Sequence, residues 1–286
     1  MQRRKWHICL IRPQGYVHSS VFEELAESLG YALVALGQFV SYAENQLDAG
    51  SRNIVLAPHF LHRDLVPQLN QMDIILYNFE QIPTHLNIWQ GYENLLLRFP
   101  IWDYQEAHVH WLRERGNPRV RYVPYGYTPR LTRLPLEKTA TDIDVLFIGS
   151  LTERRRVVLE QLSRAGVRVG HAFGIYGLRR DLLLARSRVV LNCHQFTEQD
   201  PLEEMRLLYA WANGKPVVAE VPDPSKVPSV FRGAAVWARY DGLVDACLGL
   251  LNDEEMVEQL VKEGYRVARE RDYVNILRQV IFEEVD

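Results

Sequence analysis

The chain of 286 residues has few cysteines, few lysines and no long apolar run. Its three cysteines, Cys9, Cys193 and Cys247, are far apart in the sequence, which argues against a disulfide framework and against a cysteine zinc site. Such cysteine usage is typical of a reducing compartment, so we expect a cytoplasmic protein. No segment approaches the roughly 18 apolar residues of a membrane-spanning helix, and the apolar stretch near the N-terminus is too short for a signal peptide.

The chain also lacks an excess of charge of one sign. It has 33 basic and 36 acidic residues, with a formal net charge of -3. Because nucleic-acid affinity depends mainly on neutralising phosphates, this balance argues against a nucleic-acid partner. Arginine supplies 28 of the basic residues and lysine five. A GC-rich genome explains that bias, but arginine is also suited to bidentate phosphate binding.

What the sequence does contain is a repeated alternation of short apolar runs and helical periods. In the first half, polar, glycine or proline breaks separate these segments. We expect strands at 6–11, 53–57, 73–77 and 119–123, and helices at 18–37, 84–98 and 103–115. This alternation predicts a parallel sheet with helices on both faces.

The segment 125–142 has no clear period and contains Pro129 and Pro135, which makes it the best domain boundary. The alternation then restarts. Strands are expected at 143–148, 167–173, 189–192, 216–219 and 234–238, and helices at 152–165, 178–186, 201–213, 243–251, 253–271 and 273–284.

The sequence thus predicts an α/β protein with two tandem Rossmann-like, doubly wound domains, 1–130 and 131–272. The last segment, 273–286, is expected to form a helix that crosses back to the first domain. Ligands of such sheets bind at the carboxyl ends of the strands, so we expect a cleft there.

Four motifs in the second half carry a resemblance. They are FIGSLTERR at 147–155, LNCH at 191–194, E-x-x-R at 203–206 and NGKPVVAE at 213–220. In this order they resemble the nucleotide-sugar-binding domain of GT-B glycosyltransferases, and are most similar to bacterial members related to the spore protein CgeB or attached to tetratricopeptide-repeat proteins. The resemblance covers 143–225 and extends loosely to WDY at 102–104 and VPYGY at 123–127.

The resemblance implies a metal-independent glycosyltransferase with no bound cofactor. Its co-substrate would be a UDP, GDP or dTDP sugar, its acceptor a hydroxyl of a glycan, protein or small molecule, and the first domain would hold that acceptor. The glutamate pair of the large retaining group is missing, because Pro201 and Tyr209 occupy its places. The CgeB-like variant, with Glu203 and Arg206, therefore fits better.

The residue types in these motifs are suited to a diphosphate. Gly149 and Ser150 close a strand and open a helix, so amide groups and the positive helix end point to one place. Arg154 or Arg155, in the first helical turn, could clamp a phosphate oxygen. Glu203 and Arg206 share one helix face, where the carboxylate could accept ribose hydroxyls and the arginine could neutralise phosphate.

Three further residues complete the predicted donor site. Glu220 lies at the carboxyl end of its strand. His194 is either a ligand or a hydrogen-bonded core histidine. Tyr176 either stacks on a nucleobase or packs on its own domain.

Catalytic candidates lie in the first half. Inverting transfer needs a general base near the acceptor hydroxyl. His18 follows the first strand, and an imidazole is suited to the role of a base, although His18 could instead help to cap a helix. Glu80 and His59 follow later strands and are expected to face the same edge of the sheet. Asp103 is either catalytic or the N-cap of the next helix.

No metal site is predicted. Asp142 and Asp144 spell a D-x-D motif, but they precede a strand, whereas the manganese motif of another glycosyltransferase fold follows one. Two other functions remain open. One is a nucleotide-sugar epimerase of GT-B architecture, and the other is a non-catalytic, glycosyltransferase-like assembly module. The oligomeric state does not follow from the sequence.

Overall fold

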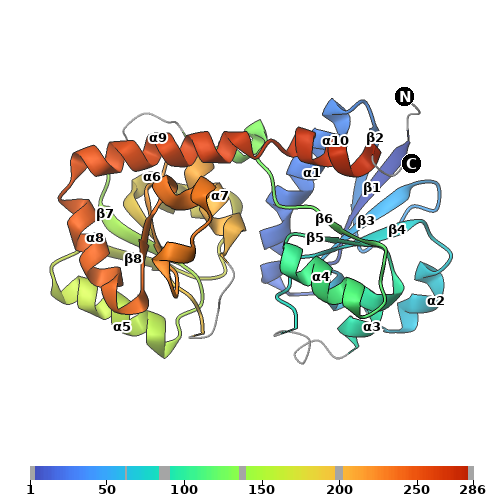
Figure 1. The fold of residues 1–286 in the computed structure, drawn as a ribbon, viewed down its shortest axis with the longest axis horizontal. Helices are drawn as coiled ribbons and strands as arrows, with labels where there is room; N and C mark the ends of the chain where they lie inside the picture. The colour runs from blue at the N-terminus through green and yellow to red at the C-terminus, as the bar shows by residue number, and fades with distance from the viewer. Residues whose placement is uncertain (1–3, 62, 84–90, 135–139, 197–201, 283–286) are drawn as a thin grey trace. The chain divides into compact units, whose positions relative to one another are not determined.

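The structure is a computed structural model that describes residues 4–61, 63–83, 91–134, 140–196 and 202–282. The chain divides into two compact units. The N-terminal unit comprises Met1–Arg130 and Asp272–Asp286, and the C-terminal unit comprises Leu131–Arg271. Figure 1 labels the helices and strands of both units.

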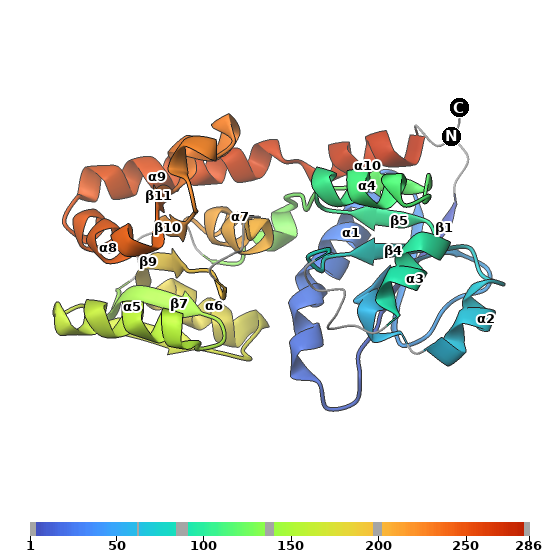
Figure 2. The same cartoon turned by 60° about the horizontal axis from the view of Figure 1, so that its bottom comes forward.

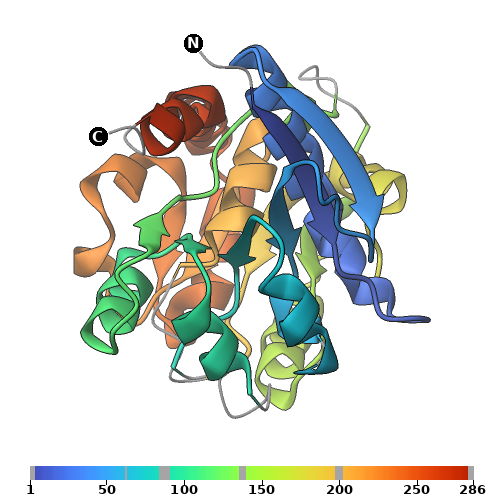
Figure 3. The same cartoon turned by 90° about the vertical axis from the view of Figure 1, so that its right-hand side faces the viewer.

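The N-terminal unit contains a six-stranded parallel sheet in the order β2-β1-β3-β4-β5-β6. Figure 3 shows β1 and β2 side by side. The strands are β1 (Lys5–Leu10), β2 (Phe39–Glu44), β3 (Arg52–Leu56), β4 (Ile74–Asn78), β5 (Ile101–Asp103) and β6 (Val120–Tyr122). The inner strands β3 and β4 are apolar and buried along nearly their whole length, as expected for a parallel sheet covered on both faces.

Helices of different lengths connect or follow these strands. They are η1 (Val17–Phe22), α1 (Glu23–Ala35), η2 (Pro58–Phe60), η3 (Arg63–Leu65), α2 (Val66–Leu69), α3 (Tyr92–Arg98), α4 (Glu106–Glu114), η4 (Pro129–Leu131) and α10 (Tyr273–Phe282). One buried apolar cluster joins β3, β4 and β5 to α3 and α4.

The last helix, α10, belongs to the N-terminal unit although it follows the C-terminal unit in sequence. It packs against α1. The Tyr273 amide donates to Tyr127 O (2.9 Å), and the Tyr273 hydroxyl lies 3.1 Å from that of Tyr77. A side chain at Gly126 would stand 2.7 Å from Tyr273 Cβ, so the close approach of the two segments requires glycine there.

The C-terminal unit contains a five-stranded parallel sheet in the order β11-β10-β9-β7-β8. Its strands are β7 (Ile143–Ile148), β8 (Val169–Ala172), β9 (Ser187–Asn192), β10 (Val217–Glu220) and β11 (Val236–Ala238). Its helices are α5 (Glu153–Arg164), α6 (Gly177–Arg186), α7 (Glu204–Ala212), η5 (Pro224–Lys226), η6 (Ser229–Ala234), η7 (Tyr240–Gly242), α8 (Leu243–Leu251) and α9 (Glu254–Glu270). Figure 2 shows this unit from a second direction.

The central strands of this unit pack on α5 and α8. Phe147 and Val189 of the sheet share a buried apolar cluster with Leu162 of α5 and Cys247 of α8. α9 is the longest helix, with 17 residues, and Asp253 caps it by accepting from the Met256 amide (2.9 Å). Among the described residues, no helix combines the length and apolar character needed to cross a membrane.

The predicted fold class, two parallel α/β domains, is confirmed. Two strands were not predicted. β2 has a mostly exposed pattern at the sheet edge, and β5 has only three residues. The helix expected at 18–37 begins as the 3-10 turn η1, and the one expected at 103–115 begins only at Glu106. Of the helix expected at 84–98, residues 84–90 lie outside the described part of the chain.

We expect the three cysteines to be unreactive in the folded protein. All three are buried free thiols. Burial raises the pKa of Cys9 to about 11 and the pKa values of Cys193 and Cys247 to about 12, so almost no thiolate is present near neutral pH. A thiol reagent at pH 8 should label none in buffer and all three in denaturant. Rapid labelling of the native protein would contradict this placement.

Candidate donor site in the C-terminal unit and polar cluster in the N-terminal unit

Most of the predicted donor residues gather at the carboxyl ends of three adjacent strands. Gly149 follows β7, His194 follows β9, and Glu220 ends β10. α5 and α7 begin close to the same edge and contribute the predicted arginines and Glu203. The C-terminal unit therefore has a polar cluster where ligands of open α/β sheets bind.

The backbone of Gly149 is held inside the fold. Its amide donates to Ala172 O (2.9 Å), and its carbonyl oxygen lies 2.9 Å from His171 Nε2. A Cβ at Gly149 would stand 3.4 Å from Arg206 Nη1 and 3.5 Å from Arg155 Nη1. The Phe147 ring is closer still, at 3.0 Å from that Cβ position, so the missing side chain lets two guanidinium groups and a ring approach the backbone. The Gly149 amide is itself engaged in the sheet.

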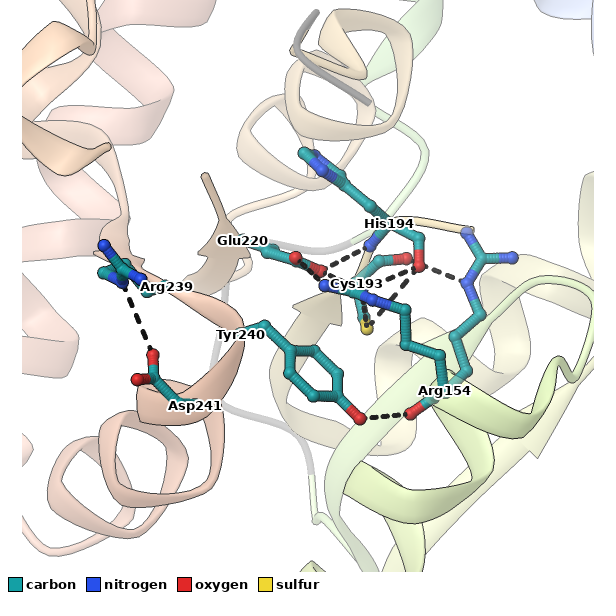
Figure 4. Close-up of polar contacts among 8 residues, drawn as sticks. Arg154, Cys193, His194, Glu220, Arg239, Tyr240 and Asp241 are labelled. Carbon is teal, nitrogen blue, oxygen red and sulfur yellow. Dashed lines mark hydrogen bonds and ion pairs between the residues drawn. The ribbon is translucent and has the colours of Figure 1, made fainter. Parts of the chain in front are cut away.

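Arg154 and Glu220, both predicted to bind the donor, bind each other. Arg154 Nη1 donates to Glu220 Oε2 (2.6 Å), and Nη2 pairs with the second carboxylate oxygen. The guanidinium lies 3.9 Å from the Tyr240 ring centroid, and the Tyr240 hydroxyl donates to Arg154 O (2.9 Å). Figure 4 shows this group, which also includes the His194 amide donating to Glu220 Oε2 (2.8 Å).

Burial alone would raise the pKa of Glu220, but the hydrogen bonds from Arg154 and the His194 amide outweigh burial and lower it. Arg154 is thus neutralised inside the fold. Its pairing joins the start of α5 to the ends of β9 and β10.

Arg155 is the most deeply buried cation of the cluster, with 1% of its surface exposed. Its Nε donates to Cys193 O (2.9 Å), and Nη1 donates to Ser150 O and Oγ (both 3.1 Å). Nη2 has no hydrogen bond. Burial, and next the charge of Arg206, lower the pKa of Arg155, because two cations lie close together.

Glu203 lies between these two arginines. Glu203 Oε1 is 4.0 Å from Arg155 Nη2, and Oε2 is 3.4 Å from Arg206 Nη1. Among the described residues of this group, one carboxylate therefore faces two guanidinium groups, which leaves an excess of positive charge. The Arg206 side chain is 46% exposed, whereas Arg155 is buried. Arg206 is thus the cation of this group that a ligand can reach.

His194 and Tyr176 differ in burial. His194 is 2% exposed, its Nε2 makes no hydrogen bond, and its ring points away from the Arg154–Glu220 pair (Figure 4). Tyr176 is half-buried at the N-cap of α6, just beyond the end of β8. Tyr240 was not predicted. Its position two residues after β11 is the signal that could have indicated it.

The D-x-D aspartates are engaged with arginines. Asp142 pairs with Arg186, and Asp144 lies 2.7 Å from Arg168 and 3.4 Å from Arg188. The Arg168 hydrogen bonds outweigh burial and lower the pKa of Asp144. Within the described residues, no group of three or more His, Cys, Asp or Glu side chains could hold a metal ion.

The catalytic candidates of the N-terminal unit lie at different depths. His18 is half-buried in η1, with its ring edge-on to Tyr16 at 5.2 Å. The Glu80 side chain is 20% exposed and follows β4. Asp103 is fully buried at the end of β5. Of these three side chains, Asp103 is the one with no surface to offer a substrate.

Asp103 is the centre of a buried hydrogen-bond network. Its Oδ1 accepts from the Gln105 amide (2.9 Å) and lies 3.0 Å from His108 Nδ1. Its Oδ2 accepts from Asn78 Nδ2 (2.7 Å), and Tyr92 Oη donates to Asn78 Oδ1 (2.7 Å). Burial raises the pKa of Asp103 despite these hydrogen bonds. The N-cap of α4 is Gln105, so Asp103 does not cap that helix from the N-cap position itself.

Comparison with solved structures shows that the chain has the GT-B fold of glycosyltransferases. It is similar to HepE from Anabaena in complex with UDP-glucose (13% identity, TM-score 0.59) and to a sucrose-phosphate synthase from Thermosynechococcus elongatus (12% identity, TM-score 0.62), each over 99% of both chains. It is also similar to WaaG, a glycosyltransferase involved in lipopolysaccharide biosynthesis (12% identity, TM-score 0.57, 96% of this chain and 98% of the other).

At the level of sequence, no family model matches the chain. It is similar to uncharacterized proteins of Acanthamoeba polyphaga mimivirus. L140 is 29% identical over 203 residues, which cover 65% of this chain and 63% of L140. L138 is 30% identical over 140 residues, or 46% of this chain and 16% of L138. The matched region thus spans less than two thirds of these relatives. The relatives are viral, whereas the resemblance noted in the sequence was to bacterial proteins.

Proposed function

We propose that the protein is a glycosyltransferase that transfers a sugar from a nucleoside diphosphate donor to a hydroxyl acceptor. The observation that carries this proposal is the convergence of Arg155 and Arg206 beside Gly149, with Glu203 as the carboxylate facing both. An excess of positive charge at the carboxyl ends of parallel strands is suited to a diphosphate. Similarity to HepE, whose structure was determined with UDP-glucose, supports a UDP sugar as the first donor to test.

In this proposal the donor groups have separate roles. The exposed Arg206 contacts the diphosphate and meets the charge that develops on it as the sugar leaves. Arg155 lies behind it and holds the Ser150 turn in place. Glu203 accepts hydrogen bonds from the ribose hydroxyls and also orients Arg206. Because arginine supplies the positive charge, we propose that transfer does not require a metal ion.

Nucleotide binding tests this proposal directly. We expect calorimetry of the full chain to show binding of UDP, GDP or dTDP with a Kd on the order of 1 μM to 1 mM, and weaker binding of the matching monophosphate. The sugar nucleotide of the preferred base should be consumed at the same rate with and without EDTA. Absence of binding by all three diphosphates would refute the donor site. If the recovered sugar nucleotide has instead taken up deuterium from the solvent and no sugar has been transferred to an acceptor, the protein is an epimerase.

A further inference from the structure

A polar cluster in the N-terminal unit is organised around Glu80, two residues beyond β4. The Glu80 amide donates to Asn78 Oδ1 (3.0 Å), and Asn78 Nδ2 donates to Glu80 O (2.9 Å). The Asn78 side chain therefore holds both backbone groups of Glu80. Asn78 is itself fully buried and is held by Asp103 and Tyr92.

This arrangement places a buried charge behind a loop residue. Burying a carboxylate is unfavourable, and burial raises the pKa of Asp103. The folded state therefore holds that proton more tightly than the unfolded chain does, and the contribution of Asp103 to stability falls as the pH rises from acid to neutral. The network nevertheless uses this group to orient Asn78, and through it Glu80. Such a cost is expected where the position of a functional group must be accurate.

The Glu80 side chain is oriented as well. His59 Nδ1 lies 3.4 Å from Glu80 Oε1, so the imidazole ring stands beside one oxygen of the carboxyl group. The His59 side chain is 4% exposed, with its ring centroid 4.0 Å from that of Phe60, whereas Glu80 is 20% exposed. One side of the carboxylate is thus held from within while part of it reaches the surface.

Aromatic rings lie beside this carboxylate. Tyr16, 38% exposed, has its ring centroid 4.9 Å from that of Phe60 and 5.2 Å from that of His18. Phe60 in turn packs close to His59, which lies beside Glu80, so the rings and the carboxylate form one cluster. Burial, and next the Glu80 charge, raise the pKa of Tyr16. These residues follow β1, β3 and β4, three adjacent strands, at their carboxyl ends. An exposed aromatic ring beside a carboxylate matches a sugar, which has an apolar C–H face and a hydroxyl rim.

We propose that this cluster binds a saccharide acceptor and that Glu80 is the catalytic base that takes the proton of its attacking hydroxyl. His59, Asn78 and Asp103 are positioning residues for Glu80. This inference rests on the proposed glycosyltransferase function and differs from an assignment of His18 as the base.

The proposed transfer step involves the acceptor, the donor and Glu80. The acceptor O–H proton moves to the Glu80 carboxylate, which becomes a neutral acid. The acceptor oxygen forms a bond to the anomeric carbon, and the bond from that carbon to the diphosphate oxygen breaks. The electron pair stays on the nucleoside diphosphate, and the proton on Glu80 then passes to water.

Saccharide binding by the full chain is the first measurement. Saturation-transfer NMR with methyl pyranosides of glucose, galactose, mannose and N-acetylglucosamine, in the presence of UDP, should detect at least one ligand. Tyr16→Ala should remove that signal or weaken it at least tenfold, whereas the exposed Glu114→Gln should not change it. Glu80→Gln should keep the signal, because its amide oxygen still accepts a hydrogen bond from the acceptor hydroxyl although it cannot take the proton. If no pyranoside binds, or if Tyr16→Ala binds like the wild type, the saccharide site is refuted.

Transfer to the bound pyranoside is the second measurement. Glu80→Gln should lower kcat by about 10²–10⁴-fold while the UDP affinity and the melting temperature stay at the wild-type values. Added formate should partly restore kcat in Glu80→Ala, which a merely structural role would not allow. Full activity of Glu80→Gln, or loss only in His18→Gln, would overturn the assignment of the base. If the wild type does not bind UDP, the donor site is refuted instead. Failure of the proposed base and failure of the proposed glycosyltransferase function are therefore distinguishable.

Discussion

Arg206→Ala should weaken the binding of nucleoside diphosphate by about 100-fold, or ~2.7 kcal/mol. Arg206 is 46% exposed and its Nη1 stands beside Gly149, whereas Arg154 is paired with Glu220 and Arg155 is buried. Its loss removes the accessible cation, and the remaining cation that the described part of the chain places beside Glu203 is the buried Arg155, at 4.0 Å. The Glu203 carboxylate would then repel the phosphates that it now helps to bind through Arg206.

Arg156→Ala is the matched control. This arginine lies on α5 in the same unit and is 44% exposed, but it pairs with Glu153 and Glu160 on its own helix. Surface pairs of this kind contribute little, so the variant should bind the diphosphate like the wild type. Calorimetry on both variants, with melting temperatures to verify folding, distinguishes a local contact between Arg206 and the diphosphate from a general effect of the protein's net charge. Equal losses in both variants would mean that Arg206 acts only through long-range charge.

The fold was predictable because buried parallel strands are recognisable as short apolar runs. β4 and β7 contain such runs, and each begins within one residue of its predicted start. β2 is different. It lies at the sheet edge, and its exposed Phe39 and Tyr42 give no clear alternation. The hydrogen bonds and packing of the neighbouring strand β1 decide its structure, and local sequence does not reveal them.

The candidate donor site was predictable as a set of positions but not as a set of contacts. Residues that follow parallel strands share one edge of the sheet, so chain order alone brings Gly149, His194 and Glu220 together. Which arginine meets which carboxylate depends on side chains far apart in sequence. Arg154 and Glu220 are 66 residues apart, and their pairing removes Arg154 from the cations free to bind phosphate.

The N-terminal unit shows the same limit. Glu80 and Asp103 were both predicted as catalytic acidic residues, Glu80 after an expected strand and Asp103 at the start of an expected helix. In the structure Asp103 ends β5, is fully buried and contacts His108 of α4, whereas Glu80 lies two residues beyond β4 and reaches the surface. The difference between a positioning carboxylate and one that can contact substrate is therefore a difference in depth, which the packing of neighbouring elements sets.

Asp103→Ala should lower the free energy of unfolding of the N-terminal unit by about 3–5 kcal/mol, since each buried donor that it leaves unpaired costs about 1–3 kcal/mol. The substitution removes the acceptor for the Asn78 side chain, the Gln105 amide and His108, and each buried donor left unpaired is costly. Because a folded domain is stable by only about 5–15 kcal/mol, this loss is a large share of the total. Urea titration followed by circular dichroism measures it, with the two units fitted as separate transitions.

Asp73→Ala is the control for this measurement. Asp73 immediately precedes β4 in the same unit and is 53% exposed, with Arg52 Nε 3.3 Å from its Oδ1. An exposed pair contributes about 0–1 kcal/mol, so this variant should unfold close to the wild type. The free energy of unfolding of Asp103→Asn should lie between those of the two alanine variants. Its amide oxygen still accepts a hydrogen bond, but its NH₂ group faces a neighbouring donor. If Asp103→Ala unfolds like Asp73→Ala, the network does not stabilise the unit, and Asp103 cannot be what holds Asn78 and Glu80 in position.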